Sequence, residues 1–215
     1  MSEIQIFPSI LNADWDHMDK ELEKLKEAGA DGIHLDIMDG RFVPEKTFDL
    51  ESIRKFVALS DLFFDAHLMI VEPQKFVDGY IDCGVDSITF HLETCDGNHA
   101  INLADYIKSK GLMAGIAINP DGEIQPIIEM IEHFDLILFM SVFPGYGGQK
   151  FISEVLGNVR ILKKYCDHNK LKRVIQIDGG INDKTAPITI QAGVNNLVAG
   201  TYILKDKDYK ARIES

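Results

Sequence analysis

The sequence predicts an α/β fold in which eight parallel strands alternate with helices and close into a (β/α)8 TIM barrel, a single compact domain covering residues 1–215. Strand-like and helix-like segments alternate with a repeat of roughly 27 residues, which fits one strand plus one helix. The strand-like segments are continuously apolar, as expected for parallel strands buried on both faces. Three helix-to-strand turns share one pattern of small residues: Ala28-Gly29-Ala30-Asp31, Cys83-Gly84-Val85-Asp86 and Ala192-Gly193-Val194-Asn195. A doubly wound open sheet of eight strands is the alternative.

In the first half of the chain, every predicted strand is followed by helical spacing of apolar residues. Asp14 is a candidate N-cap for the first helix, and Gly29 closes it. Pro73 falls where the first turn of a helix tolerates proline, and Phe76 is expected on the apolar face that follows. The predicted strands are Glu3–Leu11, Ile33–Gly40, Leu62–Met69 and Val85–His91, and the predicted helices cover 14–29, 50–57, 73–83 and 100–110.

The second half repeats this alternation. Gly111 ends the fourth helix, and a glycine-rich loop over 144–148 separates the sixth strand from a helix that includes Phe151. The predicted strands are Leu112–Ile118, Phe134–Val142, Arg173–Asp178 and Val194–Ala199, and the predicted helices cover 124–131, 151–162 and 183–192, with a short, weak one from Tyr202 onward.

Composition excludes several classes of partner. The net charge of −12 and the pI near 4.9 argue against binding to nucleic acid or to an acidic membrane surface. Three cysteines without a paired spacing suggest neither a disulfide framework nor a zinc ribbon, and are typical of a reducing compartment. The chain opens without the pattern of a leader peptide and holds no apolar run of membrane-spanning length. A cytoplasmic protein is therefore expected.

Polar residues gather at the carboxyl ends of the predicted strands, while the strand interiors are mostly apolar. In a barrel these ends form the active-site rim. Positions two apart on a strand share a face, so His34, Asp36 and Met38 should point one way. Asp39 falls on the other face and is interpreted as part of the turn that ends the strand. The polar strand ends are Ser9, His34, Asp36, Asp65, His67, His91, Glu93, Asn119, Ser141, Gln176 and Asp178.

Four of these residues form a candidate metal site. His34, Asp36, His67 and Asp178 are two imidazoles and two carboxylates, a ligand set that suits zinc, iron, manganese or cobalt. Two carboxylates that face each other across a barrel mouth would also suit general acid and base catalysis on opposite faces of a substrate. Taken singly, each residue has a structural alternative, such as a satisfied core histidine or an aspartate that caps a loop.

Methionines and glycines complete the predicted site. Met38, Met69 and Met140 lie at one level and would form an apolar wall that excludes water from a reactive intermediate. Glycines that follow the last three strands would let backbone N–H groups approach a phosphate. No segment has the spacing of an NTPase phosphate loop. The glycine clusters are Pro144-Gly145-Tyr146-Gly147-Gly148-Gln149, Gly179-Gly180 and Gly200-Thr201.

In nearly full length and in order, these motifs resemble the ribulose-phosphate 3-epimerase family. The resemblance rests on Pro8-Ser9-Ile10-Leu11, His34-Leu35-Asp36-Ile37-Met38-Asp39-Gly40, Asp65-Ala66-His67-Leu68-Met69, Met140-Ser141-Val142 with Pro144-Gly145-Tyr146-Gly147-Gly148-Gln149, Asp178-Gly179-Gly180 and Ala199-Gly200-Thr201. It implies a metal-dependent isomerase of the pentose phosphate pathway that interconverts D-ribulose 5-phosphate and D-xylulose 5-phosphate through an enediolate. It also implies a phosphorylated ketose as substrate and a homo-oligomer.

The resemblance carries roles onto individual residues. His34, Asp36, His67 and Asp178 would bind one divalent metal ion, with Asp36 and Asp178 also acting as acid and base. Ser9 resembles the substrate-contacting serine of the family. The residues expected to line the substrate site are Ser9, Met38, His67, Met69, Met140, Gly145, Tyr146, Gly147, Gly148, Asp178, Gly179, Gly180, Gly200 and Thr201.

Four rim positions depart from the family pattern, namely Glu45, Lys46, Leu92 and Phe143. A change at the rim could alter the sugar preference and leave the metal site intact. The first alternative is therefore an allulose-6-phosphate 3-epimerase. The second, from another class, is a sugar-phosphate-binding barrel without catalytic activity.

Overall fold

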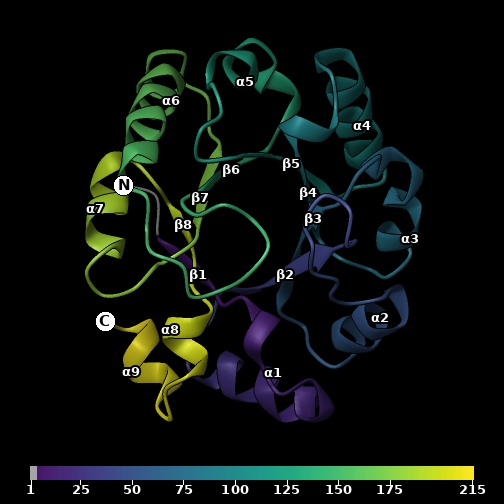
Figure 1. Ribbon diagram of the computed structural model, residues 1–215, viewed down its shortest axis with the longest axis vertical. Coiled ribbons are helices and arrows are strands. Elements are labelled where there is room, and N and C mark those ends of the chain that lie inside the picture. Colours follow the sequence, from purple (N-terminus) through teal and green to yellow (C-terminus); the bar gives the residue numbers. More distant parts are fainter. Residues whose placement is uncertain (1–3) are drawn as a thin grey trace.

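The computed structural model describes residues 4–215, in which eight parallel strands form one sheet ringed by helices (Figure 1). The strands are β1 (Gln5–Phe7), β2 (Gly32–Met38), β3 (Phe63–Met69), β4 (Ser87–His91), β5 (Met113–Ile118), β6 (Leu136–Met140), β7 (Val174–Asp178) and β8 (Asn196–Val198). Seven of them lie inside their predicted ranges, and β2 begins one residue before its predicted range. The predicted start of the first strand, Glu3, falls outside the described residues.

The sheet closes into a barrel because β1 contacts the strands at both of its edges. The hydrogen-bonded order runs β1-β8-β7-β6-β5-β4-β3-β2. On the other edge of β1, the N–H of Asp31 donates to the carbonyl of Ile6 at 3.0 Å, and the N–H of His34 donates to the carbonyl of Pro8 at 3.0 Å. These bonds join β1 to β2, so the TIM-barrel prediction is confirmed and the open doubly wound sheet is excluded.

Helices cover the outside of the barrel between successive strands. They are α1 (Met18–Glu27), α2 (Leu50–Ala58), α3 (Val77–Ile81), α4 (Gly97–Ser109), α5 (Gln125–Glu129), α6 (Leu156–His168), α7 (Ala186–Ala192), α8 (Thr201–Leu204) and α9 (Tyr209–Ile213). None of these helices, within residues 4–215, combines the length and the apolar character needed to cross a membrane.

Several predicted boundaries are wrong, including those of the first strand, the third helix and the sixth helix. The first strand does not continue to Leu11, because a 3₁₀ turn over Ile10–Asn12 follows Ser9, whose hydroxyl accepts the N–H of Leu11 at 3.3 Å. The helix predicted from Pro73 breaks at Phe76, where φ is −121°. The Phe76 ring is about half exposed rather than part of the apolar face. Phe151 lies before α6, outside the helix predicted to include it.

Apolar side chains form two layers, one outside and one inside the barrel. Ile33, Leu35 and Ile37 of β2 point outward into the main core beneath the helices and are at most 1% exposed. Full burial of side chains of this kind contributes roughly 1.5–3 kcal/mol each. Inside the barrel, Leu138 and Met140 belong to a smaller apolar cluster. The alternate residues of β2 are therefore free to carry polar groups into the barrel interior.

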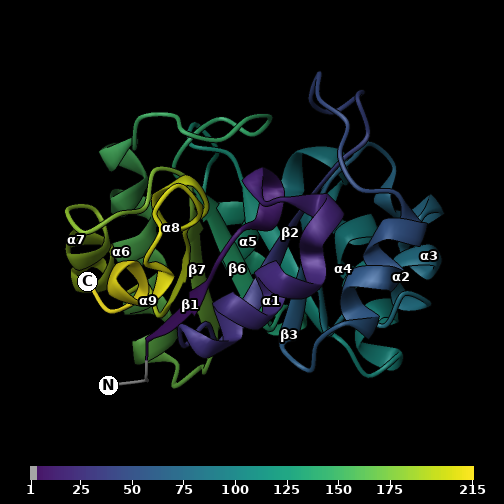
Figure 2. The same ribbon diagram turned by 90° about the horizontal axis from the view of Figure 1, so that it is seen from below.

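The carboxyl ends of all eight strands meet at one end of the barrel, because the strands are parallel. Figure 2 shows the long loops after β2 and β6 rising from that end. Asp39 anchors the first of these loops: its carboxylate accepts the N–H groups of Arg41, Phe42 and Val71, each at 2.8–2.9 Å. The structure thus agrees with the interpretation of Asp39 as a turn residue.

Candidate active site

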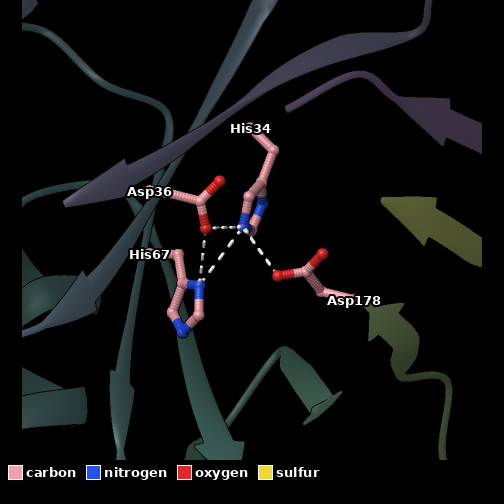
Figure 3. A group of neighbouring side chains, drawn as sticks. All are labelled: His34, Asp36, His67 and Asp178. Atoms are coloured by element: carbon pink, nitrogen blue, oxygen red, sulfur yellow. Dashed lines mark hydrogen bonds and ion pairs between the residues drawn. The ribbon is translucent and has the colours of Figure 1, made fainter. Parts of the chain in front are cut away.

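Four ionisable side chains converge inside the mouth of the barrel (Figure 3). His34 and Asp36 come from β2, His67 comes from β3, and Asp178 is the last residue of β7. Nε2 of His34 lies 3.3 Å from Nδ1 of His67, 3.6 Å from Oδ1 of Asp36 and 4.0 Å from Oδ2 of Asp178. The same Asp36 oxygen lies 3.5 Å from Nδ1 of His67. The sequence-predicted set is thus brought together at one point.

Strand parity and register produce this convergence. His34 and Asp36 are two residues apart on β2 and point to the same side, into the barrel. Asp36 is in register with His67 on the neighbouring strand β3. Asp178 reaches the cluster from β7, and Figure 3 shows its carboxylate and that of Asp36 on either side of the His34 ring.

The cluster fits a divalent cation. Nitrogen and oxygen ligands bind zinc-like ions at about 2.0–2.2 Å, so two ligands of one ion are separated by at most about 4.4 Å. The four contacts given above fall within that limit, and all four ligand atoms lie within 4.8 Å of one another. Two imidazoles and two carboxylates suit Zn²⁺, Fe²⁺, Mn²⁺ or Co²⁺ alike. A buried group of this kind can hold a metal ion.

The two histidines have opposite protonation preferences. Burial disfavours the charged form of His34, but its hydrogen bond to Asp65 and the charges of Asp36, Asp65 and Asp178 outweigh burial and raise its pKa to about 9. For His67, burial dominates: the contact with Asp36 offsets it only in part, and the pKa falls to about 4. Near neutral pH, His34 is therefore charged and His67 is neutral as long as no cation is bound.

The pKa values of the two carboxylates, Asp36 and Asp178, are shifted in opposite directions. Burial raises the pKa of Asp178, and the nearby charge of Asp36 raises it further. Burial alone would also raise the pKa of Asp36, but its contact with His67, the charge of His34 and the hydrogen bond from Ser9 bring it below its usual value. The Ser9 hydroxyl donates to Oδ2 of Asp36 at 2.5 Å. Divergent carboxylates of this kind are typical of an acid and base pair.

Metal binding should release protons from this site. A cation and a proton compete for Nε2 of His34, whose pKa of about 9 keeps it protonated at pH 7 in the metal-free protein. We expect Zn²⁺ affinity to rise with pH, by about tenfold per pH unit for each proton released, and to level off above pH 9. Calorimetric titration in buffers of different ionisation enthalpy measures the protons directly. An affinity that is constant from pH 6 to 9, with no proton release, would contradict the assignment.

A buried polar network supports His34 from below, and it corrects the expectation that the strand interiors are apolar. Oδ2 of Asp65 accepts the Nδ1–H of His34 at 2.8 Å and an amide N–H of Gln176 at 2.8 Å. Oδ1 of Asp65 accepts the hydroxyl of Ser87 at 2.6 Å, and Gln176 also donates to Asn196 at 3.0 Å. All four supporting side chains are at most 1% exposed. Because Asp65 accepts the hydrogen bond from Nδ1–H, the other ring nitrogen of His34, Nε2, faces the cluster.

A pocket at the barrel mouth lies directly above this cluster. With the exception of the buried His34 and His67, every predicted site residue lines it. The lining comprises Ser9, Leu11, Asn12, Asp36, Met38, Met69, Met140, Val142, Phe143, Pro144, Gly145, Tyr146, Gly147, Gly148, Gln149, Asp178, Gly179, Gly180, Ile181, Val198, Gly200, Thr201 and Tyr202. Among the described residues that line it, none is a lysine or an arginine.

Within the glycine clusters, Gly180 is required by a close approach to another backbone segment of the protein. At Gly180, with φ +64°, a Cβ atom would lie 2.9 Å from the backbone nitrogen of Phe151, so only glycine fits. The amide of Gln149 donates to the carbonyls of Phe143 and Tyr146, at 2.7 and 2.9 Å, and holds the loop after β6 in shape. Six glycines of these clusters line the pocket, namely Gly145, Gly147, Gly148, Gly179, Gly180 and Gly200.

Sequence reasoning missed several residues of the site. The sequence pattern puts Asp65 at a strand end on the same face as His67 but gives it no role in the site. Asn12 lines the pocket, and its amide lies 3.4 Å from the Thr201 hydroxyl, a contact between residues that no local pattern connects. Of the four departures from the family pattern, only Phe143 lines the pocket. The rim positions Glu45, Lys46 and Leu92 lie outside its lining.

Comparison with known proteins gives one consistent result. Residues 5–204 match the model of the "Ribulose-phosphate 3 epimerase family". The chain is 39% identical to a ribulose-phosphate 3-epimerase of Bacillus subtilis, with 98% of this chain and 96% of the relative covered. It is 39% identical to the Synechocystis enzyme of that name, over 98% and 91% of the two chains. It is 38% identical to a chloroplastic ribulose-5-phosphate-3-epimerase of Arabidopsis thaliana, over 99% and 76%.

Solved structures agree on the fold. A 3-hexulose-6-phosphate synthase aligns with a TM-score of 0.69 at 14% identity, over 99% of this chain and 96% of the other. The tryptophan synthase α-subunit of Pyrococcus furiosus aligns with a TM-score of 0.69 at 15% identity, over 99% and 93%. At such low identity the likeness concerns the barrel alone.

Proposed function

Since the chain belongs to the ribulose-phosphate 3-epimerase family and is an epimerase, we propose that it inverts carbon 3 of a ketose phosphate and interconverts D-ribulose 5-phosphate and D-xylulose 5-phosphate. One observation carries the proposal: two carboxylates with opposite pKa shifts approach one point from β2 and β7. Inversion at a carbon next to a ketone needs a base on one face and an acid on the other. The two aspartates supply this pair.

Each aspartate has a distinct task in the first half of the reaction. Asp36, ionised and held by the Ser9 hydroxyl, removes the C3 proton. Asp178, with its raised pKa, holds a proton and delivers it to the opposite face of the resulting enediolate. After one turnover the protonation states are exchanged, and the same pair then serves the reverse reaction. The catalysis by each positioned group contributes about 10² to 10⁴ in rate.

His34, Asp36, His67 and Asp178 would hold one divalent metal ion. Such a cation supplies Lewis-acid stabilisation for the negative charge that develops on the substrate oxygens. The side chains of Met38, Met69 and Met140 line the pocket beside the two aspartates. They would exclude water, so that the enediolate is reprotonated by Asp178 and not by solvent.

The glycine loops would hold the phosphate of the substrate. The pocket-lining residues Gly147, Gly148, Gly180, Gly200 and Thr201 lie at the same mouth as the aspartates. With no lysine or arginine among the described lining residues, the donors available to an anion are uncharged groups, among them backbone N–H groups and the Thr201 hydroxyl.

A reducing, cytoplasmic location is also proposed. The support is that Cys83, Cys95 and Cys166 are free thiols, as is typical of proteins in such compartments. The homo-oligomeric state and the assignment of residues 1–215 to one domain stay predictions.

A panel of substrates tests the proposed reaction. We expect turnover of D-ribulose 5-phosphate at a rate well above that of D-allulose 6-phosphate, and incorporation of one solvent deuterium at C3 per turnover in deuterated water. A faster rate with the six-carbon ketose would shift the assignment to the allulose enzyme. Retention of every substrate proton, together with tight binding, would instead indicate a barrel that binds without catalysis.

A further inference from the structure

A row of hydrogen-bonded side chains leads from the metal cluster to the rim of the barrel. Nε2 of His67 lies 2.8 Å from Nε2 of His91, and Nδ1 of His91 lies 3.2 Å from Oε2 of Glu93. Oε1 of the same carboxylate accepts the backbone N–H of Asn119 at 2.8 Å. His67 and His91 are fully buried, so water cannot replace a missing partner in the row.

The donor and acceptor in each hydrogen bond of this row can be assigned by starting from Glu93, at the rim. An ionised carboxylate only accepts hydrogen bonds, so Nδ1 of His91 carries its proton toward Glu93. A neutral imidazole has one N–H, so Nε2 of His91 is then an acceptor, and the only donor that can face it is an N–H on Nε2 of His67. That leaves Nδ1 of His67, the atom nearest to His34 and Asp36, with a free lone pair.

We infer that Glu93, acting through His91, fixes the tautomer of His67 in which Nδ1 is free to bind the metal. Both are positioning residues. The inference rests on the proposed role of His67 as a ligand and deepens it. His34 needs the opposite tautomer, with Nε2 free, and obtains it from Asp65 in one step. His67 would bind the metal through Nδ1, and its tautomer is fixed by a relay of two residues in series, His91 and Glu93.

The geometry around His91 supports a fixed relay. The Phe42 ring packs against the His91 ring with centroids 4.7 Å apart, and the His67 and His91 rings stack at 5.0 Å. The hydroxyl of Thr94 donates to the backbone carbonyl of His91 at 2.7 Å. At the other end, Asp36 lies 3.5 Å from Nδ1 of His67, which is beyond a good hydrogen bond and cannot compete for the proton on equal terms.

A single substitution reverses the order of the row without removing an atom from it. In Glu93→Gln, the amide oxygen still accepts the N–H of Asn119, so the NH₂ group turns toward His91 and donates to its Nδ1. The proton of His91 then moves to Nε2 and faces His67, whose own proton must sit on Nδ1. Glu93→Gln should therefore weaken metal binding more than Glu93→Ala. The alanine variant removes the acceptor but does not force either histidine into one tautomer.

The test measures Zn²⁺ binding by competition with a chromogenic chelator, and the His67 tautomer of the metal-free protein by long-range ¹H–¹⁵N NMR. We expect Glu93→Gln to weaken Zn²⁺ binding by about 10- to 100-fold, Glu93→Ala to weaken it less, and the wild-type His67 to carry its proton on Nε2. In Glu93→Gln the proton should appear on Nδ1. The control is Glu123→Gln, the same change of charge at an exposed position of the loop after β5, with unchanged affinity.

Two results would overturn the inference. One is a wild-type His67 that carries its proton on Nδ1 in the metal-free protein, a measurement that needs no variant to fold. The other is a loss of affinity in Glu93→Ala equal to or larger than that in Glu93→Gln, as expected for plain structural support. Failure of the wild-type protein to bind Zn²⁺ through His67 would contradict the proposed function instead, and the NMR measurement distinguishes the two cases.

Discussion

Replacement of Asp178 by asparagine is expected to lower kcat by about 10²- to 10⁴-fold and to leave the fold intact. Asparagine has nearly the same shape as aspartate but cannot hold or deliver the proton that the raised pKa of Asp178 retains. Asp36→Asn should lose activity to the same extent, because it removes the complementary base. Steady-state kinetics and thermal unfolding measure the two effects separately. Near-normal turnover in either variant would contradict the two-aspartate mechanism.

Exchange of the C3 proton with deuterated solvent tests which aspartate acts on which epimer. Each single variant keeps one carboxylate, which can still remove the C3 proton from one of the two epimers. We therefore expect slow exchange of that proton in deuterated water without inversion, for one epimer in Asp178→Asn and for the other in Asp36→Asn. Asp183→Asn is the matched control, since Asp183 is exposed on the loop that follows β7. Exchange of both epimers by a single variant would indicate one base that reaches both faces.

Replacement of Asp65 by alanine is expected to reduce the free energy of unfolding by about 3–5 kcal/mol, the usual consequence of removing one partner from a buried charged network. Asp65 is fully buried and accepts hydrogen bonds from His34, Ser87 and Gln176. Its loss would leave three buried polar groups without their partner and His34 without its proton acceptor. Urea unfolding of the metal-free protein at pH 7 measures the change.

The control for Asp65→Ala is Asp82→Ala, which removes an exposed carboxylate at the carboxyl end of α3. A negative charge at that end of a helix is unfavourable, so we expect little change in stability. A loss below about 1 kcal/mol in Asp65→Ala, comparable to an exposed hydrogen bond, would show that the network is not needed for folding.

The strand-helix repeat predicts the barrel, and the alternation of side chains along each strand predicts the four-residue cluster. Both can be predicted because they depend on regular geometry. The alternation of Ile33, Leu35 and Ile37 with His34 and Asp36 already separates the outward and inward faces of β2. Register then brings His67 beside Asp36. The helix break at Phe76 could not be predicted in this way, because a ring at an apolar position of the pattern may still face solvent.

The supporting network was harder to predict because its partners are distant in the chain. Gln176 and Asp65 are 111 residues apart and meet only because the barrel closes. The order of protons along His67, His91 and Glu93 likewise depends on hydrogen-bond distances that no spacing encodes. Sequence patterns locate side chains on a strand face, but satisfaction of buried polar groups is a property of the closed structure.

The pocket that contains no lysine or arginine among its described residues has a consequence for the rate of substrate encounter. A sugar phosphate is an anion, and it must approach a protein of net charge −12 with no lysine or arginine among the described residues of the pocket lining to attract it. Binding would then depend on short-range contacts, such as those with the backbone N–H groups proposed above to hold the phosphate. Dissolved salt, which shortens the reach of the protein's field to about 8 Å at physiological ionic strength, should speed the encounter and not slow it.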